Sequence, residues 1–515
     1  NVVFFGATSA TVQSVVGTTT LTVTVPYGAN YQYISVTNLA YNTTGYSAIP
    51  FVSTYSPTGD NSFWPKSSYS AGSAPTYVTL SDLNLDGKPD LVVANANNTL
   101  SIFPNTTSVA GVTSTNFGSV VSLTGAAGSV SSSVVVGDMD GDGRPDVALV
   151  NSGANLVSIF RNVSTSTISF TTQAVTFTGG TSPSSIALAD FDGDGRPDLV
   201  LSNSGTSVLL FRNLSVSGTI AFVGQQTVTS GTTPRSLSVG DFDKDGQIDL
   251  VVANWGSNNV QVFRNTSVTG TISFSLSATL TTGVSSPSSV VVGDFNGDSF
   301  LDIAVCNNTS GNTVSVFMSN SVTGTISFPT SMTATTGPSP LSLAIGDMNG
   351  DGYVDLVTAN SASSTVSVLS NASTSSLSFT AKLDISGISS TNTGGLAVGD
   401  MNGDGWPDIV TTTSGTNNNV AVFFQYQRLT QSLTITSLNT ASIGSSLSIT
   451  VQRSISPTGL ISSANALNYS ITTTTGGGSA TVNALGNLTA IGVGNITLTV
   501  TAAGDTNYRP ASTSQ

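Results

Sequence analysis

Seven acidic segments of nine residues recur along this chain, and their regular spacing restricts the fold more than any other feature. Successive segments start 51 to 56 residues apart. They begin at Asp82, Asp138, Asp190, Asp241, Asp294, Asp347 and Asp400. A fixed period of this length indicates a protein built from repeated structural units. The segments hold 24 of the 27 acidic residues in the 515-residue chain, and every acidic residue is an aspartate.

Each segment has the pattern of a calcium-binding loop. Oxygen-bearing side chains stand at positions 1, 3 and 5, an aspartate stands at position 9, and six of the seven segments have glycine at position 6. Because Ca²⁺ takes six to eight oxygen ligands, this spacing predicts that position 7 adds its carbonyl and that position 9 closes the shell with both carboxylate oxygens. An EF-hand would need Glu at position 12 and flanking helices. Here position 12 is Val, Leu or Thr, and both flanks are predicted to be strands.

The predicted side-chain ligands are Asp82, Asn84, Asp86 and Asp90; Asp138, Asp140, Asp142 and Asp146; Asp190, Asp192, Asp194 and Asp198; Asp241, Asp243, Asp245 and Asp249; Asp294, Asn296, Asp298 and Asp302; Asp347, Asn349, Asp351 and Asp355; and Asp400, Asn402, Asp404 and Asp408. The predicted carbonyl ligands are those of Lys88, Arg144, Arg196, Gln247, Phe300, Tyr353 and Trp406.

Charge favours metal binding over the simpler alternative that Asp, Asn and Gly only form turns here. Carboxylates this close together would repel one another or take up protons without a cation. Seven divalent ions would cancel the formal net charge of −14. The sequence therefore predicts about seven bound Ca²⁺ ions. In the fifth segment Ser299 replaces the glycine, at a cost of about 1 kcal/mol if the turn needs a positive φ, so the Asp294 loop is predicted to bind most weakly.

Each repeat is predicted to form four short strands, with the acidic segment between the first and second. The composition is rich in Ser, Thr, Asn, Gly and Val, and the two middle strands are continuous apolar runs. A four-stranded antiparallel unit of about 50 residues is the blade of a β-propeller. The seventh repeat lacks a fourth strand, whereas a segment of that type precedes the first loop. We therefore expect residues near 62–70 to complete blade seven, which closes the ring and removes exposed sheet edges.

The repeats resemble FG-GAP or VCBS repeats, which form the seven-bladed calcium propeller also found at the head of integrin α subunits. The resemblance covers about residues 58–427 and implies calcium loops between the first two strands of each blade. Residues 1–57 resemble part of an IPT/TIG immunoglobulin-like domain, and residues 428–515 resemble a bacterial Ig-like β-sandwich without its last strand. The expected fold class is all-β, a seven-bladed β-propeller flanked by Ig-like modules.

The incomplete flanks leave two interpretations open. In the first, the chain is a processed or partial piece of a longer protein. In the second, neighbouring subunits supply the missing strands, and this strand addition joins molecules head to tail. A contact of that kind does not close on itself and would build a filament.

Composition argues against several classes of function. The chain has no His and no Glu, and its single cysteine, Cys306, occupies a register where other repeats carry Ala, so we expect no enzyme. A pI near 4.1 without a basic cluster argues against nucleic acid. No apolar run has the length of a membrane span.

We therefore expect an extracellular, calcium-stabilised structural or adhesion protein of a bacterial cell surface, with a head-to-tail filament subunit as one form of it. Its partners would be other copies of itself, surface proteins or glycans. The alternative is a glycan-binding, lectin-like module of a larger secreted protein, in which the position-7 side chains form the binding rim.

Glycosylation is a further expectation. Charged residues make up only 8% of the chain, and so uncharged a surface needs another means of staying soluble. Sequons of the N-x-S/T type recur after the third strand of several repeats. The candidate attachment sites are Asn105, Asn162, Asn213, Asn265 and Asn371.

Overall fold

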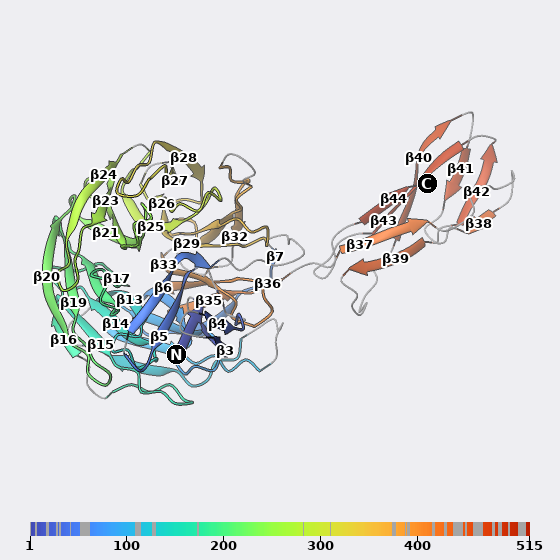
Figure 1. The fold of residues 1–515 in the computed structure, drawn as a ribbon. Coiled ribbons are helices and arrows are strands. Elements are labelled where there is room, and N and C mark those ends of the chain that lie inside the picture. Colours follow the sequence, from blue (N-terminus) through green and yellow to red (C-terminus); the bar gives the residue numbers. More distant parts are fainter. Residues whose placement is uncertain are drawn as a thin grey trace. The chain divides into compact units, whose positions relative to one another are not determined.

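The computed structural model divides into two compact units, residues 1–425 and residues 426–515, and contains strands but no helix among the residues that it describes (Figure 1). It describes residues 2–514 apart from 6–7, 17–19, 27–28, 30–31, 42, 52–61, 109–114, 126–129, 172–174, 282, 310, 373–376, 387, 389–391, 415–417, 427–429, 436–445, 449–450, 457–466, 476–478, 483–486, 493–494 and 503–510. Within these residues no helix is long and apolar enough to cross a membrane.

The described part of residues 62–425 forms seven four-stranded antiparallel sheets, each of which is one blade of a propeller. Blades one to three are β9 (Pro75–Ser81), β10 (Asp90–Asn95), β11 (Thr99–Phe103) and β12 (Val121–Thr124); β13 (Ser131–Gly137), β14 (Asp146–Asn151), β15 (Leu156–Phe160) and β16 (Val175–Thr178); and β17 (Ser185–Ala189), β18 (Asp198–Ser202), β19 (Ser207–Asn213) and β20 (Phe222–Thr229).

Blades four to six follow the same order. They are β21 (Pro234–Gly240), β22 (Asp249–Asn254), β23 (Asn259–Asn265) and β24 (Phe274–Leu280); β25 (Pro287–Gly293), β26 (Asp302–Asn307), β27 (Thr313–Met318) and β28 (Thr330–Thr335); and β29 (Pro340–Gly346), β30 (Asp355–Asn360), β31 (Thr365–Leu369) and β32 (Leu383–Ile385). Blade seven contains β33 (Asn392–Gly399), β34 (Asp408–Ser414) and β35 (Asn419–Phe423), and its outer strand is β8 (Ser67–Ser70).

The ring is closed by a strand from the other end of the propeller sequence. β8 pairs antiparallel with β35, with Tyr69 opposite Val420. The short strands β7 (Ser62–Phe63) and β36 (Gln425–Tyr426) also pair. The innermost strands of successive blades contact one another around the whole ring, including β33 of blade seven with β9 of blade one. This pairing matches the expectation that residues near 62–70 supply the fourth strand.

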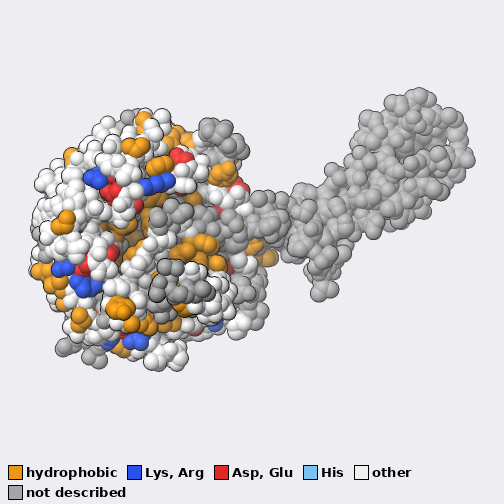
Figure 2. Space-filling model, in the orientation of Figure 1, with side chains coloured by type: hydrophobic (Ala, Val, Ile, Leu, Met, Phe, Trp, Pro, Cys, Tyr) orange, Lys and Arg blue, Asp and Glu red, His pale blue; other side chains and the backbone are white. Residues whose placement is uncertain are grey.

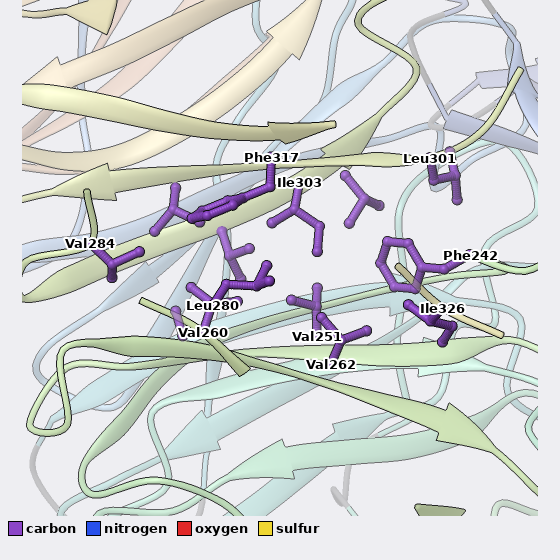
Figure 3. Packing of buried hydrophobic residues seen from close by; sticks show 14 residues of the cluster. Phe242, Val251, Val260, Val262, Leu280, Val284, Leu301, Ile303, Phe317 and Ile326 are labelled. Carbon is purple, nitrogen blue, oxygen red and sulfur yellow. The ribbon is translucent and has the colours of Figure 1, made fainter. Parts of the chain in front are cut away.

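The hydrophobic core consists of a separate cluster at each joint between blades. The cluster between blades four and five contains Val251 and Val262 from one blade and Ile303 and Phe317 from the next (Figure 3). Equivalent clusters fill the other six joints. The middle strands face such a cluster on both sides, which explains their continuous apolar sequence; β22, for example, is fully buried along its length.

Two smaller groups of strands precede and follow the propeller in the sequence. The N-terminal group contains β1 (Val2–Phe5), β2 (Thr8–Ala10), β3 (Val12–Val16), β4 (Thr20–Val23), β5 (Gln32–Asn38) and β6 (Thr43–Phe51), with a sheet in the order β2-β1-β5-β6 and a β3-β4 hairpin. The C-terminal unit contains β37 (Thr430–Ile435), β38 (Ser446–Ser448), β39 (Val451–Ser456), β40 (Leu467–Thr475), β41 (Ser479–Val482), β42 (Asn487–Gly492), β43 (Asn495–Ala502) and β44 (Ala511–Ser514). Their assignment as Ig-like modules stays a prediction.

Candidate metal centre

Each acidic segment forms the loop between the first and second strands of a blade, and its own carboxylates hold the loop in shape. In the third loop the two oxygens of Asp190 accept the N–H groups of Asp194 (3.1 Å) and Gly195 (2.8 Å), and Asp194 accepts the N–H of Arg196 (3.0 Å). The same bonds recur in the other six loops. All seven loops therefore share one backbone conformation.

That conformation needs a left-handed residue at two positions. At position 6 the glycines have φ near +85°, and Ser299 is held at +71°, so the predicted strain in the fifth loop is confirmed. Position 4 also has positive φ, which the sequence analysis overlooked. Five loops have glycine there, whereas Leu85 (+60°) and Lys244 (+56°) adopt the same conformation without it.

The position-9 aspartates are the most enclosed acids of the site. Asp249 is fully buried, and its two oxygens accept the N–H groups of Phe242 (2.9 Å) and Asn265 (2.8 Å). Each oxygen therefore keeps one lone pair for a cation, so the predicted ligand role is compatible with this anchoring role. Burial, outweighing the hydrogen bonds from the backbone, raises the pKa of Asp249 to about 8 and the pKa values of Asp198 and Asp302 to about 7.

In blades two to four, three carboxylates of one loop converge closely enough to hold a metal ion. One oxygen from each of three aspartates lies within 4.8 Å of the others in each of these loops. The groups are Asp138, Asp140 and Asp146; Asp190, Asp192 and Asp194; and Asp241, Asp243 and Asp249. The other four loops have Asn in place of one carboxylate, and their Asn side chain binds the position-5 aspartate, as Asn349 binds Asp351 (3.0 Å).

An arginine that the sequence analysis missed accompanies each four-carboxylate loop. Arg212 donates from Nε to Asp192 (2.6 Å) and from a terminal nitrogen to Asp194 (2.7 Å). Arg161 and Arg264 make the equivalent pairs in the second and fourth loops. The signal was present in the sequence, because "FRN" follows the apolar run of the third strand only in the repeats that have Asp at position 3.

These arginines bring the local charge close to what a divalent ion can neutralise. In the third loop Arg196 also binds Asp194 (2.6 Å), so that four carboxylates and two guanidinium groups leave a local charge of −2. Arg144 and Arg161 give the second loop the same charge. Figure 2 shows such groups as small clusters of red and blue on an otherwise mostly uncharged surface. The residues present fit a divalent cation bound through carboxylate oxygens.

The position-2 side chain ties each loop to the joint with the next blade. Phe242 is fully buried in the cluster between blades four and five, and Phe191 lies in the cluster between blades three and four. The same holds for Leu83, Met139, Phe295, Met348 and Met401 in the remaining joints. Each loop is therefore both a candidate metal site and part of the joint.

A buried amide completes this link. Asn265 of blade four donates from Nδ2 to the carbonyl of Phe191 in the loop of blade three (2.9 Å) and to the carbonyl of Ile248 in its own loop (2.9 Å). Asn105, Asn162, Asn213 and Asn371 bind in the same way, and Gln425 donates to the carbonyl of Met348. In blade five the equivalent residue is Ser319, which binds Ser321 instead (2.8 Å).

This arrangement does not fit glycosylation at the five predicted asparagines. Asn105, Asn162, Asn213, Asn265 and Asn371 are at most 1% exposed. Both hydrogens of each Nδ2 are donated to main-chain carbonyls, and a glycan would replace one of them. The sequon has a structural reason instead: the Asn oxygen accepts the N–H two residues later, as from Ser267 (2.8 Å), and that serine's hydroxyl accepts the N–H of Ser273 (2.9 Å).

The position-7 side chains lie against the loops. Arg144 and Arg196 fold back onto the position-5 aspartates of their own loops. Phe300 lies under the Lys244 ammonium of the preceding loop, 3.6 Å from the ring centre. Tyr353 lies beside Gly297 of the preceding loop. Phe300 and Tyr353 therefore cover the joints between neighbouring blades, whereas Arg144 and Arg196 cover their own loops.

The chain belongs to the family of FG-GAP-like repeats. The family matches residues 82–149, 138–201, 190–252, 241–305, 300–358 and 347–411, and these matches together span more than half of the chain and all seven acidic loops. The chain is thus a β-propeller built of FG-GAP repeats. No curated protein matches it in sequence.

Solved structures resemble the propeller only distantly. One is BBS1N in complex with ARL6DN, at 15% identity and a TM-score of 0.46, covering 71% of this chain and 97% of that one. Virginiamycin B lyase from Staphylococcus aureus matches at 11% identity with a TM-score of 0.44, covering 71% of this chain and 100% of the lyase. A functionally unknown protein from Desulfotomaculum acetoxidans matches at 17% identity with a TM-score of 0.43, covering 69% of this chain and 99% of that one. Likeness at this level carries no conclusion about activity, and the expectation that this chain is not an enzyme stays a prediction.

The amide at the blade joints can be tested in both directions. We expect Ser319→Asn to raise the free energy of unfolding by about 1 kcal/mol, because it supplies the missing bond to the preceding blade, and Asn265→Ser to lower it by about 1 to 3 kcal/mol. Urea unfolding in excess Ca²⁺ measures both changes. Ser217→Asn, at an exposed turn, is the control. A Ser319→Asn protein no more stable than Ser217→Asn would contradict the joint's assigned role.

The buried aspartates predict an inverted pH dependence in the absence of metal. Their folded-state pKa values are raised, to about 6 for Asp138, 7 for Asp198 and 8 for Asp249, above the value near 3.9 of an unfolded chain. Protonation therefore stabilises the fold fully below about pH 4, and this stability is lost as the pH rises through 6 to 8. In EDTA we expect the melting temperature to fall over this range. With saturating Ca²⁺, which binds the deprotonated aspartates, the melting temperature should no longer fall as the pH rises. An equal fall of the melting temperature in EDTA and in Ca²⁺ would argue against metal binding.

Proposed function

We propose that this protein is an extracellular, calcium-stabilised structural or adhesion protein of a cell surface. The observation that carries the calcium part is the set of three converging carboxylates in loops whose position-9 aspartate is fully buried. Burying an ionised carboxylate is costly unless a cation or hydrogen bonds compensate it. A divalent ion in each loop supplies that compensation at the point where the loop meets the blade joint.

The structural or adhesive part rests on what the loops are used for. Among the described acidic residues, 24 aspartates lie in the seven loops, where they shape turns and anchor joints and are not grouped around a separate reaction centre. The low-affinity calcium loops of extracellular modules, with Kd values of about 10⁻⁴ to 10⁻³ M, suit a protein that works where calcium is abundant. A bacterial surface remains the location that we favour. A head-to-tail filament joined by strand addition is one form that this function takes.

A lectin-like function is the second candidate. Trp406, which is half-buried, stands at position 7 of the seventh loop, and aromatic rings are common in sugar sites. The contacts of Phe300 and Tyr353 with neighbouring loops weaken this alternative, because they use side chains of the predicted rim to cover joints. It therefore depends on Trp406 more than on the ring of position-7 residues.

Calcium binding is tested by titration of the metal-free protein. We expect about seven bound Ca²⁺ per chain by isothermal titration calorimetry and a melting temperature that rises with calcium concentration, because only the folded state offers the sites. The Asp294 loop should fill last, since Ser299 is held at φ +71° and Lys244 places a positive charge beside Phe300 of that loop.

The weakness of the fifth loop can be isolated with one variant. Ser299→Gly should bring its affinity up to that of the other three-carboxylate loops, whereas Ser331→Gly, an exposed control in the same blade, should not. A melting temperature that is the same in EDTA and in calcium would refute the calcium proposal. If the fifth loop is instead the last to lose its calcium under a chelator, only the predicted weakness of that loop is refuted.

Electron microscopy of the full-length protein from its native source separates the two functions. Regular fibres in calcium, lost on chelation, support the structural proposal. Single particles that bind a defined glycan on an array, with binding abolished by Trp406→Ala and retained in Trp255→Ala, support the lectin instead.

A further inference from the structure

The N-terminal sheet lies against the acidic loops of the propeller. Ser9 of β2 donates its hydroxyl hydrogen to Oδ2 of Asp82, the first residue of the first loop, and its N–H points to the same oxygen (3.4 Å). Thr44 of β6 donates its N–H to the carbonyl of Gly195 in the third loop (2.7 Å). The blue strands β5 and β6 cross the face of the ring in Figure 1. We call residues 2–51 the N-terminal cap.

Close packing supports these hydrogen bonds. A Cβ atom on Gly143 of the second loop would come within 2.8 Å of Val2 and Leu39, and one on Gly195 would come within 2.9 Å of Thr43. Next to the fourth loop, a Cβ on Gly240 would lie 3.2 Å from the hydroxyl of Tyr33. The cap thus contacts the acidic loops of blades one to three and the end of the first strand of blade four, next to its loop.

One face of the cap is built for this contact. Val3 and Phe5 of β1 belong to the cap's own hydrophobic cluster. Phe4 points to the opposite face because side chains alternate along a strand, yet it is only 7% exposed. Val2 lies on the same face as Phe4 and packs at Gly143. The apolar face of β1 that carries Val2 and Phe4 is therefore covered by the propeller.

The electrostatics of this contact are unusual. Residues 1–59 contain no Asp, Glu, Lys or Arg, so the cap cannot form an ion pair with the acidic loops through its side chains. Covering carboxylates with an uncharged surface removes water from them without supplying a counter-charge, which is unfavourable. A cation in each covered loop removes that penalty.

We propose that the N-terminal cap is held on the propeller by calcium, with Ser9 acting through Asp82 as the positioning residue that couples the first calcium site to cap docking. This inference rests on the proposed calcium binding and goes beyond it. A cavity of about 350 Å³ between the cap and the first loop, lined by Val2, Ser9, Val12, Leu85 and Asp86 among others, gives the ion a path to the covered site. By linkage, the docked cap must strengthen calcium binding by the same factor as calcium strengthens docking.

Hydrogen exchange on the full chain tests the coupling. We expect amides of β1 and β5 to exchange about tenfold faster in EDTA than in saturating Ca²⁺, a typical size for coupling between two sites. Calorimetry on the same samples records calcium binding independently. Calcium binding without any change in cap exchange would overturn the coupling and leave the proposed calcium function standing. The absence of calcium binding would overturn both.

Matched variants locate the coupling. Asp82→Asn, at saturating Ca²⁺, should speed exchange in the cap, whereas Asp347→Asn, in a loop with the same Asp-Asn-Asp-Asp ligand set, should weaken one calcium site and leave cap exchange unchanged. If Asp82→Asn does not fold, Ser9→Ala replaces it. Ser9→Ala should weaken one calcium site several-fold and speed cap exchange, and Ser14→Ala, on the exposed part of β3, should do neither. Equal effects of the two serine variants, or of the two aspartate variants, would refute the proposal.

Discussion

The buried position-9 carboxylate is the contact on which the propeller most depends. In each blade one of its oxygens accepts the N–H of the position-2 residue, and the other accepts the N–H of a residue at the end of the third strand or within two residues after it, as Asp249 does with Phe242 and Asn265. Phe242 packs into the next joint, and the amide of Asn265 reaches back to the previous one. The hydrogen bonds thus run from joint to joint through the acidic loops. A change in the charge of a loop therefore affects the stability of the interface between two blades.

The joint between blades four and five differs from the rest. Ser319 binds Ser321, whereas the amides of the other blades bind a main-chain carbonyl of the preceding blade, and the blade of Ser319 also carries the strained Ser299. Two other contacts connect these blades. Lys244 stacks on Phe300, and the N–H of Gly324 in blade five bonds to Asp243 in blade four (3.0 Å). The equivalent bonds from Gly218 and Gly270 connect blades two to four in the same way. The position-3 aspartates therefore belong to the joints as well as to the loops.

Much of this architecture could be predicted from the sequence because local signals repeat seven times. The period, the apolar middle strands and the turn chemistry of "DFDGDGRPD" all favour the same fold, and repetition separates them from chance. Asn265 and Arg212 were harder to interpret, because each acts on a partner distant in sequence. A sequon read locally suggests a glycan, whereas the folded chain uses that asparagine to bind Phe191, 74 residues away. The contact of Ser9 with Asp82 has no local signal at all.

The way the ring is closed determines how tension would pass through the molecule. The chain enters the propeller through β8, which pairs with β35 near its exit, and the N–H of Trp64 bonds to the carbonyl of Phe424 (2.9 Å). A pull applied at both ends of the propeller segment is therefore transmitted across these few antiparallel pairs. The other six blades are spared the load. These six blades keep their shape under tension as long as the pairing of β8 with β35 holds. That is a mechanical advantage for any protein that tethers one body to another.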